Sequence, residues 1–296
     1  MKFELSGHFW LRAVNAETGA VRELGEFDNL ILDGGLNRLG TGGVMGYCVV
    51  GSGSTAPANS DTTLVAAVAS TSDQTSISSG QASSSPYYGY QRRTYRFGMG
   101  VAAGNLSEVG IGWTPTNLFS RALILDTGGT PTTITVLSNE FLDVTYELRV
   151  YAPTTDVTGT VSIGGVSTNF VARAAAVTDI RDWECGGIGS GVNFGTTSGS
   201  DPYCWFGSGA LGTVTQRPSG TSENVTNSRD SYANNSLAMT GGITAGLDVA
   251  NFAGGITTML VRTTLGTFQA SFSPPIAKDN TKTLRVNVSV SWGRHA

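Results

Sequence analysis

The strongest constraint on the fold is a short run of residues that occurs twice. Residues 47–53 (YCVVGSG) return roughly half a chain later as residues 203–209 (YCWFGSG). Each run has the pattern of an apolar strand that enters a Gly-Ser-Gly turn. Because similar segments at a long spacing are typical of repeated structural units, this pair indicates that one β unit occurs twice.

Two other similarities follow in the same order along the chain. Met99, Glu108 and Val109 correspond to Met239, Asp248 and Val249, and the alternating run 142–150 corresponds to 284–292. The spacings differ slightly, as insertions in loops would make them differ; chance similarity is the alternative, since Gly and Ser are abundant. We therefore predict an all-β protein of two tandem antiparallel β-sandwich-like domains related by internal duplication, residues 1–153 and 154–296.

Hydrophobic alternation and turn residues predict the elements of both halves. We expect three hairpins, a helical turn capped by Asp33, and strands that close the second half, the last of them inside its sheet. We also expect a short helix over 56–68, an exposed arm over about 54–89, and long loops over about 179–200 and 213–235, because these stretches are rich in Ser, Thr and Gly. The hairpins are 3–14 with 21–27, 118–126 with 132–136, and 157–163 with 166–174; the closing strands are 237–249, 257–261, 266–272 and 284–292.

Composition narrows the classes of partner. Charged residues are 14% of the 296 residues, against about 25% in ordinary soluble domains, and the net charge is −4 without a basic block. The sequence therefore does not predict nucleic-acid binding. It also has no run of 18 apolar residues and no secretory core at its start, so we expect no membrane span and synthesis in the cytoplasm.

Tyrosine and arginine gather in one stretch, residues 87–97. In a strand, Tyr90, Arg92 and Arg96 would share one face, and this composition is typical of interface cores. The alternative is a sheet whose outer face carries arginines over aromatic rings. Candidate residues for contact with a partner or a glycan are Tyr87, Tyr88, Tyr90, Arg92, Arg93, Arg96, Trp183 and Trp205.

No pattern predicts catalysis. The two histidines, His8 and His295, have no nucleophile at motif spacing, and no metal or phosphate motif occurs. The acid pairs Asp182 with Glu184 and Glu140 with Asp143 are too close in sequence to indicate a glycosidase pair. We expect no enzyme activity, cofactor or metal. Buried thiols are the preferred interpretation of the cysteines, although Cys185 and Cys204 could pair in an oxidising setting.

Six segments in the first half carry a family resemblance. They are 29–39 (NLILDGGLNRL), 48–57 (CVVGSGSTAP), 60–64 (SDTTL), 106–113 (LSEVGIGW), 118–122 (LFSRA) and 143–148 (DVTYEL). In this order they resemble tail proteins of tailed bacteriophages from the tail tip, baseplate or fibre region. The resemblance covers residues 1 to about 150 and carries over no functional residue.

The resemblance implies a structural protein of the virion, made in the host cytoplasm. Its copies would form a homo-oligomer, a trimer or a hexameric ring, and would contact other tail proteins. Such a component could anchor fibres that attach to a host glycan or pilus. The alternatives are a capsid decoration or head-fibre protein, and a carbohydrate-binding module that recognises a bacterial surface.

Overall fold

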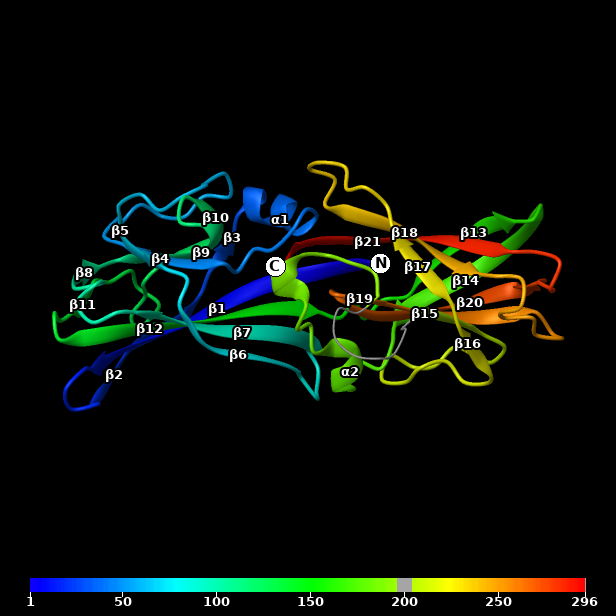
Figure 1. The fold of residues 1–296 in the computed structure, drawn as a ribbon, viewed down its shortest axis with the longest axis horizontal. Helices are drawn as coiled ribbons and strands as arrows, with labels where there is room; N and C mark the ends of the chain where they lie inside the picture. The colour runs from blue at the N-terminus through cyan, green and yellow to red at the C-terminus, as the bar shows by residue number, and fades with distance from the viewer. Residues whose placement is uncertain (196–203, 296) are drawn as a thin grey trace.

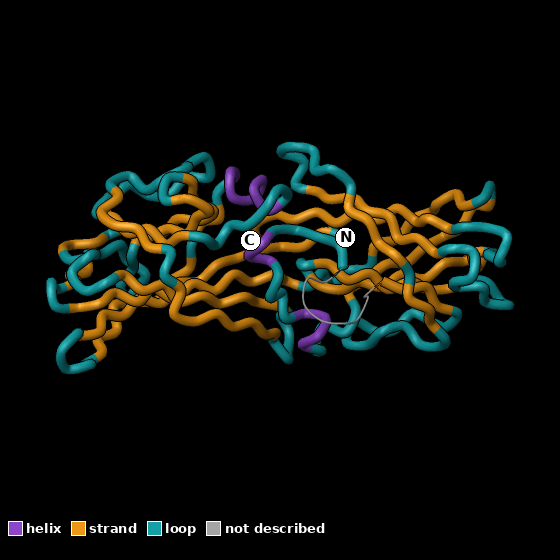
Figure 2. The backbone as a smooth tube through the Cα atoms, viewed as in Figure 1, coloured by secondary structure: helices purple, strands orange, loops and turns teal. Residues whose placement is uncertain are grey.

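The structure, a computed structural model, describes residues 1–195 and 204–295, and strands dominate it (Figure 2). Helices are confined to α1 (Asp33–Leu39), α2 (Ile180–Trp183) and a 3₁₀ turn (Ile188–Ser190) among these residues. The strands are β1 (Lys2–Asn15), β2 (Val21–Asp28), β3 (Leu30–Ile31), β4 (Tyr47–Gly51), β5 (Ala67–Thr71), β6 (Gln74–Gln81), β7 (Tyr88–Phe97), β8 (Gly104–Leu106), β9 (Glu108–Thr114), β10 (Asn117–Leu123), β11 (Ile134–Val136), β12 (Glu140–Tyr151), β13 (Val157–Ile163), β14 (Val166–Ala174), β15 (Cys204–Gly207), β16 (Ser222–Asn224), β17 (Thr226–Arg229), β18 (Ala238–Ala245), β19 (Ile256–Thr263), β20 (Gly266–Ile276) and β21 (Leu284–Arg294).

One large sheet contains strands from both halves of the chain. Its order is β17-β18-β21-β1-β12-β7-β6, and β2 also pairs with β1. On one side β1 pairs antiparallel with β12; on the other, residues 2–5 pair parallel with β21 and residues 8–14 pair antiparallel with β2. Strand β1 therefore joins the two halves along the middle of the elongated molecule (Figure 1).

Sheets of five and six strands complete the β-sandwich architecture, and β8 and β11 form a separate two-stranded sheet. The five-stranded sheet has the order β3-β10-β9-β4-β5 and belongs to the first half; the six-stranded sheet, β13-β14-β20-β19-β15-β16, belongs to the second. They lie towards opposite ends of the molecule (Figure 1). Alternate residues of β1, among them Phe3, Leu5, Phe9 and Leu11, are buried in a single apolar cluster that also includes Trp292 of β21. The apolar core is thus continuous through both halves.

The two halves share an order of strands. The path β10-β9-β4-β5 of one small sheet corresponds to β20-β19-β15-β16 of the other, and β12-β7-β6 corresponds to β21-β18-β17 in the large sheet. The repeated sequence runs form the corresponding strands β4 and β15. Internal duplication stays a prediction, and this agreement of strand order supports it.

Each short helix contacts the opposite half. On the α1 side, Trp292 of β21 donates from Nε1 to the carbonyl oxygen of Leu36 at 2.8 Å. On the α2 side, Trp183 is fully buried, with its ring centroid 6.1 Å from that of Phe3 on β1. At each of the two short helices, a tryptophan side chain therefore connects one half of the chain to the other.

The predicted hairpins 3–14 with 21–27 and 157–163 with 166–174 are confirmed as β1–β2 and β13–β14. Gly19 and the pair Gly164 and Gly165 have positive φ angles in their turns, as turn chemistry requires. The four closing strands are confirmed as β18 to β21, and β21 lies inside the large sheet between β18 and β1.

Other local predictions are wrong or hold only in part. No helix forms over 56–68, and the expected arm over 54–89 contains β5, β6 and the start of β7. The expected loop 213–235 contains β16 and β17, and 179–200 contains α2 and the 3₁₀ turn, with residues 196–203 outside the described part. Asp33 does not cap α1; it is the first helical residue and pairs with Arg294. Strand β11 pairs with β8, so only an isolated bridge between Leu125 and Pro131 remains of the hairpin predicted over 118–136.

Candidate contact face of the large sheet

The outer face of the large sheet carries most of the residues that the sequence singles out. Strand β7 alternates as predicted: Tyr95 and Phe97 are fully buried in the core, whereas Tyr90, Arg92 and Arg96 are partly exposed on the other face. Because β12 and β6 pair with β7 in register, outward residues of four neighbouring strands, β1, β12, β7 and β6, form rows across this face. We call it the arginine face.

The first row places a buried acid between two arginines. Arg12 of β1, Asp143 of β12 and Arg96 of β7 are opposite one another. Both guanidinium groups donate through Nε and Nη2 to the Asp143 carboxylate, at 2.7 to 3.1 Å. Burial opposes ionisation of Asp143, but the hydrogen bonds and charges of Arg96 and Arg12 outweigh it and hold its pKa below the usual range.

A second charged row lies four residues along β12 from the first, and a neutral row lies between them. In this second row His8 of β1 and Arg92 of β7 are opposite Glu147 of β12. Glu147 of β12 accepts from Arg92 Nε at 3.0 Å and from Arg149 Nε at 2.6 Å, and its side chain is 2% exposed. The Arg92 guanidinium also lies over the ring of Trp10, 4.8 Å from its centroid, and the ring of His8 lies 4.3 Å from the same indole. Trp10 is thus packed between an arginine and a histidine.

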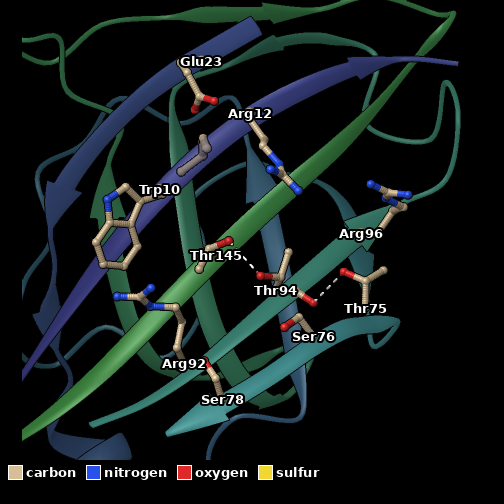
Figure 3. A pocket seen from close by; sticks show the side chains of 11 residues that line it. Trp10, Arg12, Glu23, Thr75, Ser76, Ser78, Arg92, Thr94, Arg96 and Thr145 are labelled. Atoms are coloured by element: carbon tan, nitrogen blue, oxygen red, sulfur yellow. Dashed lines mark hydrogen bonds between the residues drawn. The ribbon is translucent and has the colours of Figure 1, made fainter. Parts of the chain in front are cut away.

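A row of hydroxyl groups separates the two charged rows. Thr145 and Thr94 are opposite each other, and their Oγ1 atoms are 2.9 Å apart. Ser76 of β6 continues this row at one side and Trp10 at the other. These side chains form the floor of an open groove of about 630 Å³, shown in Figure 3, with Arg12, Arg92 and Arg96 around it and Glu23 at its rim.

Aromatic side chains continue the face beyond the charged rows. The guanidinium of Arg149 lies 5.1 Å from the ring centroid of Tyr88. Tyr88 packs against Tyr151, and Tyr151 stacks on His295 with ring centroids 3.7 Å apart. The candidate Tyr88 therefore belongs to the same face, where its ring is already in contact with neighbours.

The other candidates lie elsewhere. Arg93 points to the opposite side of β7 and donates from Nη1 to the carbonyl oxygen of Met45 at 2.8 Å. Tyr87 lines a separate depression with His295 and Tyr151. Trp205 is half-buried on β15 in a small sheet. Trp183 has no exposed surface and donates to the carbonyl oxygen of Ala175, so the prediction that it contacts a partner or stacks on a sugar is wrong.

Sequence reasoning missed the residues of β1 and β12 on this face. Trp10, Arg12 and Arg149 are outward residues of strands whose inward residues were recognised as core, so alternation alone could have identified them. Which of them would meet Arg92 or Arg96 depends on strand register, and the sequence does not specify that register.

On the arginine face, His8 Nδ1 lies 2.7 Å from a carboxylate oxygen of Asp28 on β2. The two buried carboxylates, Asp143 and Glu147, each accept hydrogen bonds from two arginines, and those to Asp143 favour its ionised form. Among the described residues no group of three or more His, Cys, Asp or Glu side chains could hold a metal ion. In the same part of the chain, no helix has the length and apolar character of a membrane span.

All three cysteines, Cys48, Cys185 and Cys204, are free and buried. Burial raises the pKa of Cys185 to about 12 and that of Cys204 to about 11. Cys185 and Cys204 are therefore reduced thiols in the structure and do not form a disulfide.

Comparison with known proteins returns no relative. No family model, no curated protein and no solved structure matches this chain.

Proposed function

We propose that this protein is a structural component of a tailed-phage virion, located in the tail tip or baseplate. Copies of the chain would assemble symmetrically and contact other tail proteins, and they could anchor the fibres that attach to the host. The sequence resemblance in the first half motivates this role.

The arginine face is the observation that supports a contact role best. Interfaces are enriched in arginine and aromatic side chains, and rigid side chains lose little entropy on binding. Here Arg12, Arg92 and Arg96 are held in place by ion pairs to buried acids, and Trp10 is packed between two neighbours. The face is therefore preorganised for association.

Locating the chain in particles tests the proposal. Phage particles purified from an infected host should contain the chain by mass spectrometry. A tagged copy labelled with gold should mark the tail tip or baseplate in electron micrographs. Absence of the chain from purified particles would refute the virion role, and label on the head would favour the capsid decoration or head-fibre alternative.

A carbohydrate-binding module is the second candidate, and the groove of Figure 3 favours it. Its hydroxyl floor and guanidinium groups can hydrogen-bond to sugars. Trp10 is poorly placed to stack on a sugar ring, because Arg92 and His8 already lie against it. A glycan array probed with the purified protein separates the candidates, since a purely structural protein should bind no glycan saturably.

A further inference from the structure

We propose that strand β13 is a docking edge for a second copy of this chain, and that two copies pair their β13 strands antiparallel about a two-fold axis at Thr160. The inference concerns a surface other than the arginine face and goes beyond the virion role. It is tested on the isolated protein, so either proposal can fail without the other.

Strand β13 forms an outer edge of the six-stranded sheet, towards one end of the molecule (Figure 1). Among the described residues it pairs with β14 alone, and no hydrogen bond from another segment reaches its backbone. A free edge is a template for pairing with another chain, so natural proteins protect edges with charges, proline or bulges. The sequence of β13, VTGTVSI, contains no charged residue or proline, and its register with β14 has no shift.

Every other edge strand of the described sheets is charged, irregular or short. Strands β2 and β16 carry charged side chains, and β17 ends in Arg229. Strands β5 and β6 are interrupted by register shifts, and Gln81 at the end of β6 also donates to the carbonyl oxygen of Thr178. Strands β3, β8 and β11 have two or three residues each. Strand β13 is therefore the long, regular and uncharged edge of the described part of the chain.

The turn that follows β13 determines which of its backbone groups are free. Gly164 and Gly165 have φ angles of 59° and 82°, typical of a two-residue type I′ turn, which a hydrogen-bonded pair closes. That pair is Ile163 with Val166. Because hydrogen-bonded and non-hydrogen-bonded pairs alternate, every second residue back from Ile163 bonds to β14, and the residues between them direct their N–H and C=O groups outwards. The outward residues are Thr158, Thr160 and Ser162.

These outward groups are arranged symmetrically about Thr160. When two copies pair antiparallel with Thr160 opposite Thr160, Thr158 lies opposite Ser162 of the second copy. Each such pair exchanges two N–H···O bonds, so the edge would gain about six backbone hydrogen bonds. The same register places hydroxyl side chains opposite hydroxyl side chains, which is a stabilising cross-strand pairing. The match of the edge to itself favours a second copy over an unrelated strand.

The core-facing side of β13 also matches itself in this register. Val161 lies opposite the buried Thr168 of β14, so its side of the strand faces the core. Val157 and Ile163 share that side by alternation, and Val157 is 42% exposed at the free edge. In the two-fold pairing Val157 lies opposite Ile163 of the second copy as a non-hydrogen-bonded pair, in which side chains are closest. Pairing would therefore cover apolar surface that the single chain exposes.

No like charges would meet across the axis. Asp156 and Arg173 are the charged residues of the hairpin over 156–174, and they form an ion pair with each other. Exposed residues of one sign directly opposite each other destabilise a sheet, so a charge introduced at the axis should block the pairing.

Sedimentation velocity of the full chain tests the edge. We expect a dimer whose proportion rises with concentration over about 1–100 μM. Thr160→Lys places like charges opposite each other at the axis and should raise the Kd of the dimer about tenfold or more. Ser167→Lys is the matched control, because it adds the same charge to the same face of the hairpin on β14 instead of the edge. It should leave the Kd within about twofold of the unchanged protein.

A mixture of two variants tests the register. Thr160→Lys and Thr160→Glu should each be largely monomeric, and an equimolar mixture should restore the dimer, because opposite charges then face each other across the axis. Thr160 is exposed, so both variants should fold, and circular dichroism checks this. Thr158→Pro removes an outward N–H without breaking a bond to β14, and it should block the dimer if the charged variants prove unstable.

Three results would overturn the proposal. They are a monomer at every concentration, an oligomer that persists unchanged in Thr160→Lys, and a mixture of the two charged variants that stays monomeric. An oligomer that persists would assign assembly to another surface. An equal loss of dimer in Ser167→Lys would also overturn it, since the effect would then be one of general charge and not of the β13 edge.

Discussion

Asp143 shows how a single residue organises the arginine face. Its side chain has no exposed surface, and it accepts hydrogen bonds from Arg12 and Arg96, which are 47% and 33% exposed. Removing one member of a buried ion pair commonly costs about 3–5 kcal/mol, because the remaining charge loses its partner. Here the arginines reach water, so the cost should be smaller.

We expect Asp143→Asn to lower the free energy of unfolding by about 2–3 kcal/mol at pH 7. The pKa of Asp143 is lowered in the folded protein, so its ionisation contributes stability above the unfolded pKa of about 3.9, and this contribution is lost as pH falls towards the folded pKa. The penalty should therefore shrink in acid. Urea unfolding at pH 7 and about pH 3 measures it, with the exposed Asp248→Asn as control. An equal penalty at both pH values would contradict this account.

The thiols provide a second test at the residue scale. Cys185 and Cys204 are buried and have raised pKa values of about 12 and about 11, so almost no thiolate exists near pH 8. A thiol-reactive dye should label the folded protein only at the rate of unfolding, and all cysteines should react promptly in denaturant. Rapid labelling of the native protein would show that these side chains are accessible.

At the scale of elements, the short helix α2 packs so closely against neighbouring strands that it limits which residues those strands can carry. The carbonyl oxygen of Trp183, at the end of α2, lies so close to β7 that a Cβ added at Gly89 would be 1.9 Å from it. Gly266 of β20, with φ +127°, makes a similar approach to the Trp183 ring. Glycine is required at both positions so that α2 can pack between strands of the two halves.

Gly89→Ala should therefore destabilise the protein by about 3 kcal/mol or more, since backbone atoms cannot move aside as a flexible side chain can. Gly34→Ala is the matched change, because Gly34 is an exposed residue of α1 with open space around it. It should be neutral or stabilising by up to about 1 kcal/mol. Thermal unfolding followed by circular dichroism measures both. Similar melting temperatures for the two variants would mean that α2 does not fix the contact between the two halves.

Hairpins that are defined by local turn residues could be predicted from the sequence. Strands that form only because they pair with a neighbouring strand could not. Gly164 and Gly165 define the β13–β14 hairpin locally. Strand β6 is almost entirely Ser, Thr, Gly and Gln and has little apolar area to bury; it forms by pairing with β7. The arginine face divides in the same way: alternation predicted the outward side of β7, whereas its buried acid partners come from β12, far away in sequence.

At the scale of the whole molecule, the predicted boundary between residues 153 and 154 separates two sandwiches that share a sheet and a core. Strand β1 pairs with both β12 and β21, and buried residues from Phe3 to Trp292 form one cluster. Two segments with such extensive contacts should not unfold independently.

We therefore expect one calorimetric transition in which the calorimetric and van't Hoff enthalpies agree. Residues 1–153 and 154–296, expressed separately, should be unstable or aggregate, because the inner edges of β1 and β21 would be exposed. Two well-separated transitions, or two soluble cooperative halves, would instead establish independent domains.

The parallel pairing of β1 with β21 also has a kinetic consequence. It joins residues 2–5 to residues 291–294, so almost the whole chain forms the intervening loop. Contacts of such long sequence separation slow folding. On the ribosome, β1 is made long before β21, so the large sheet can close only after residues 291–294 have been synthesised.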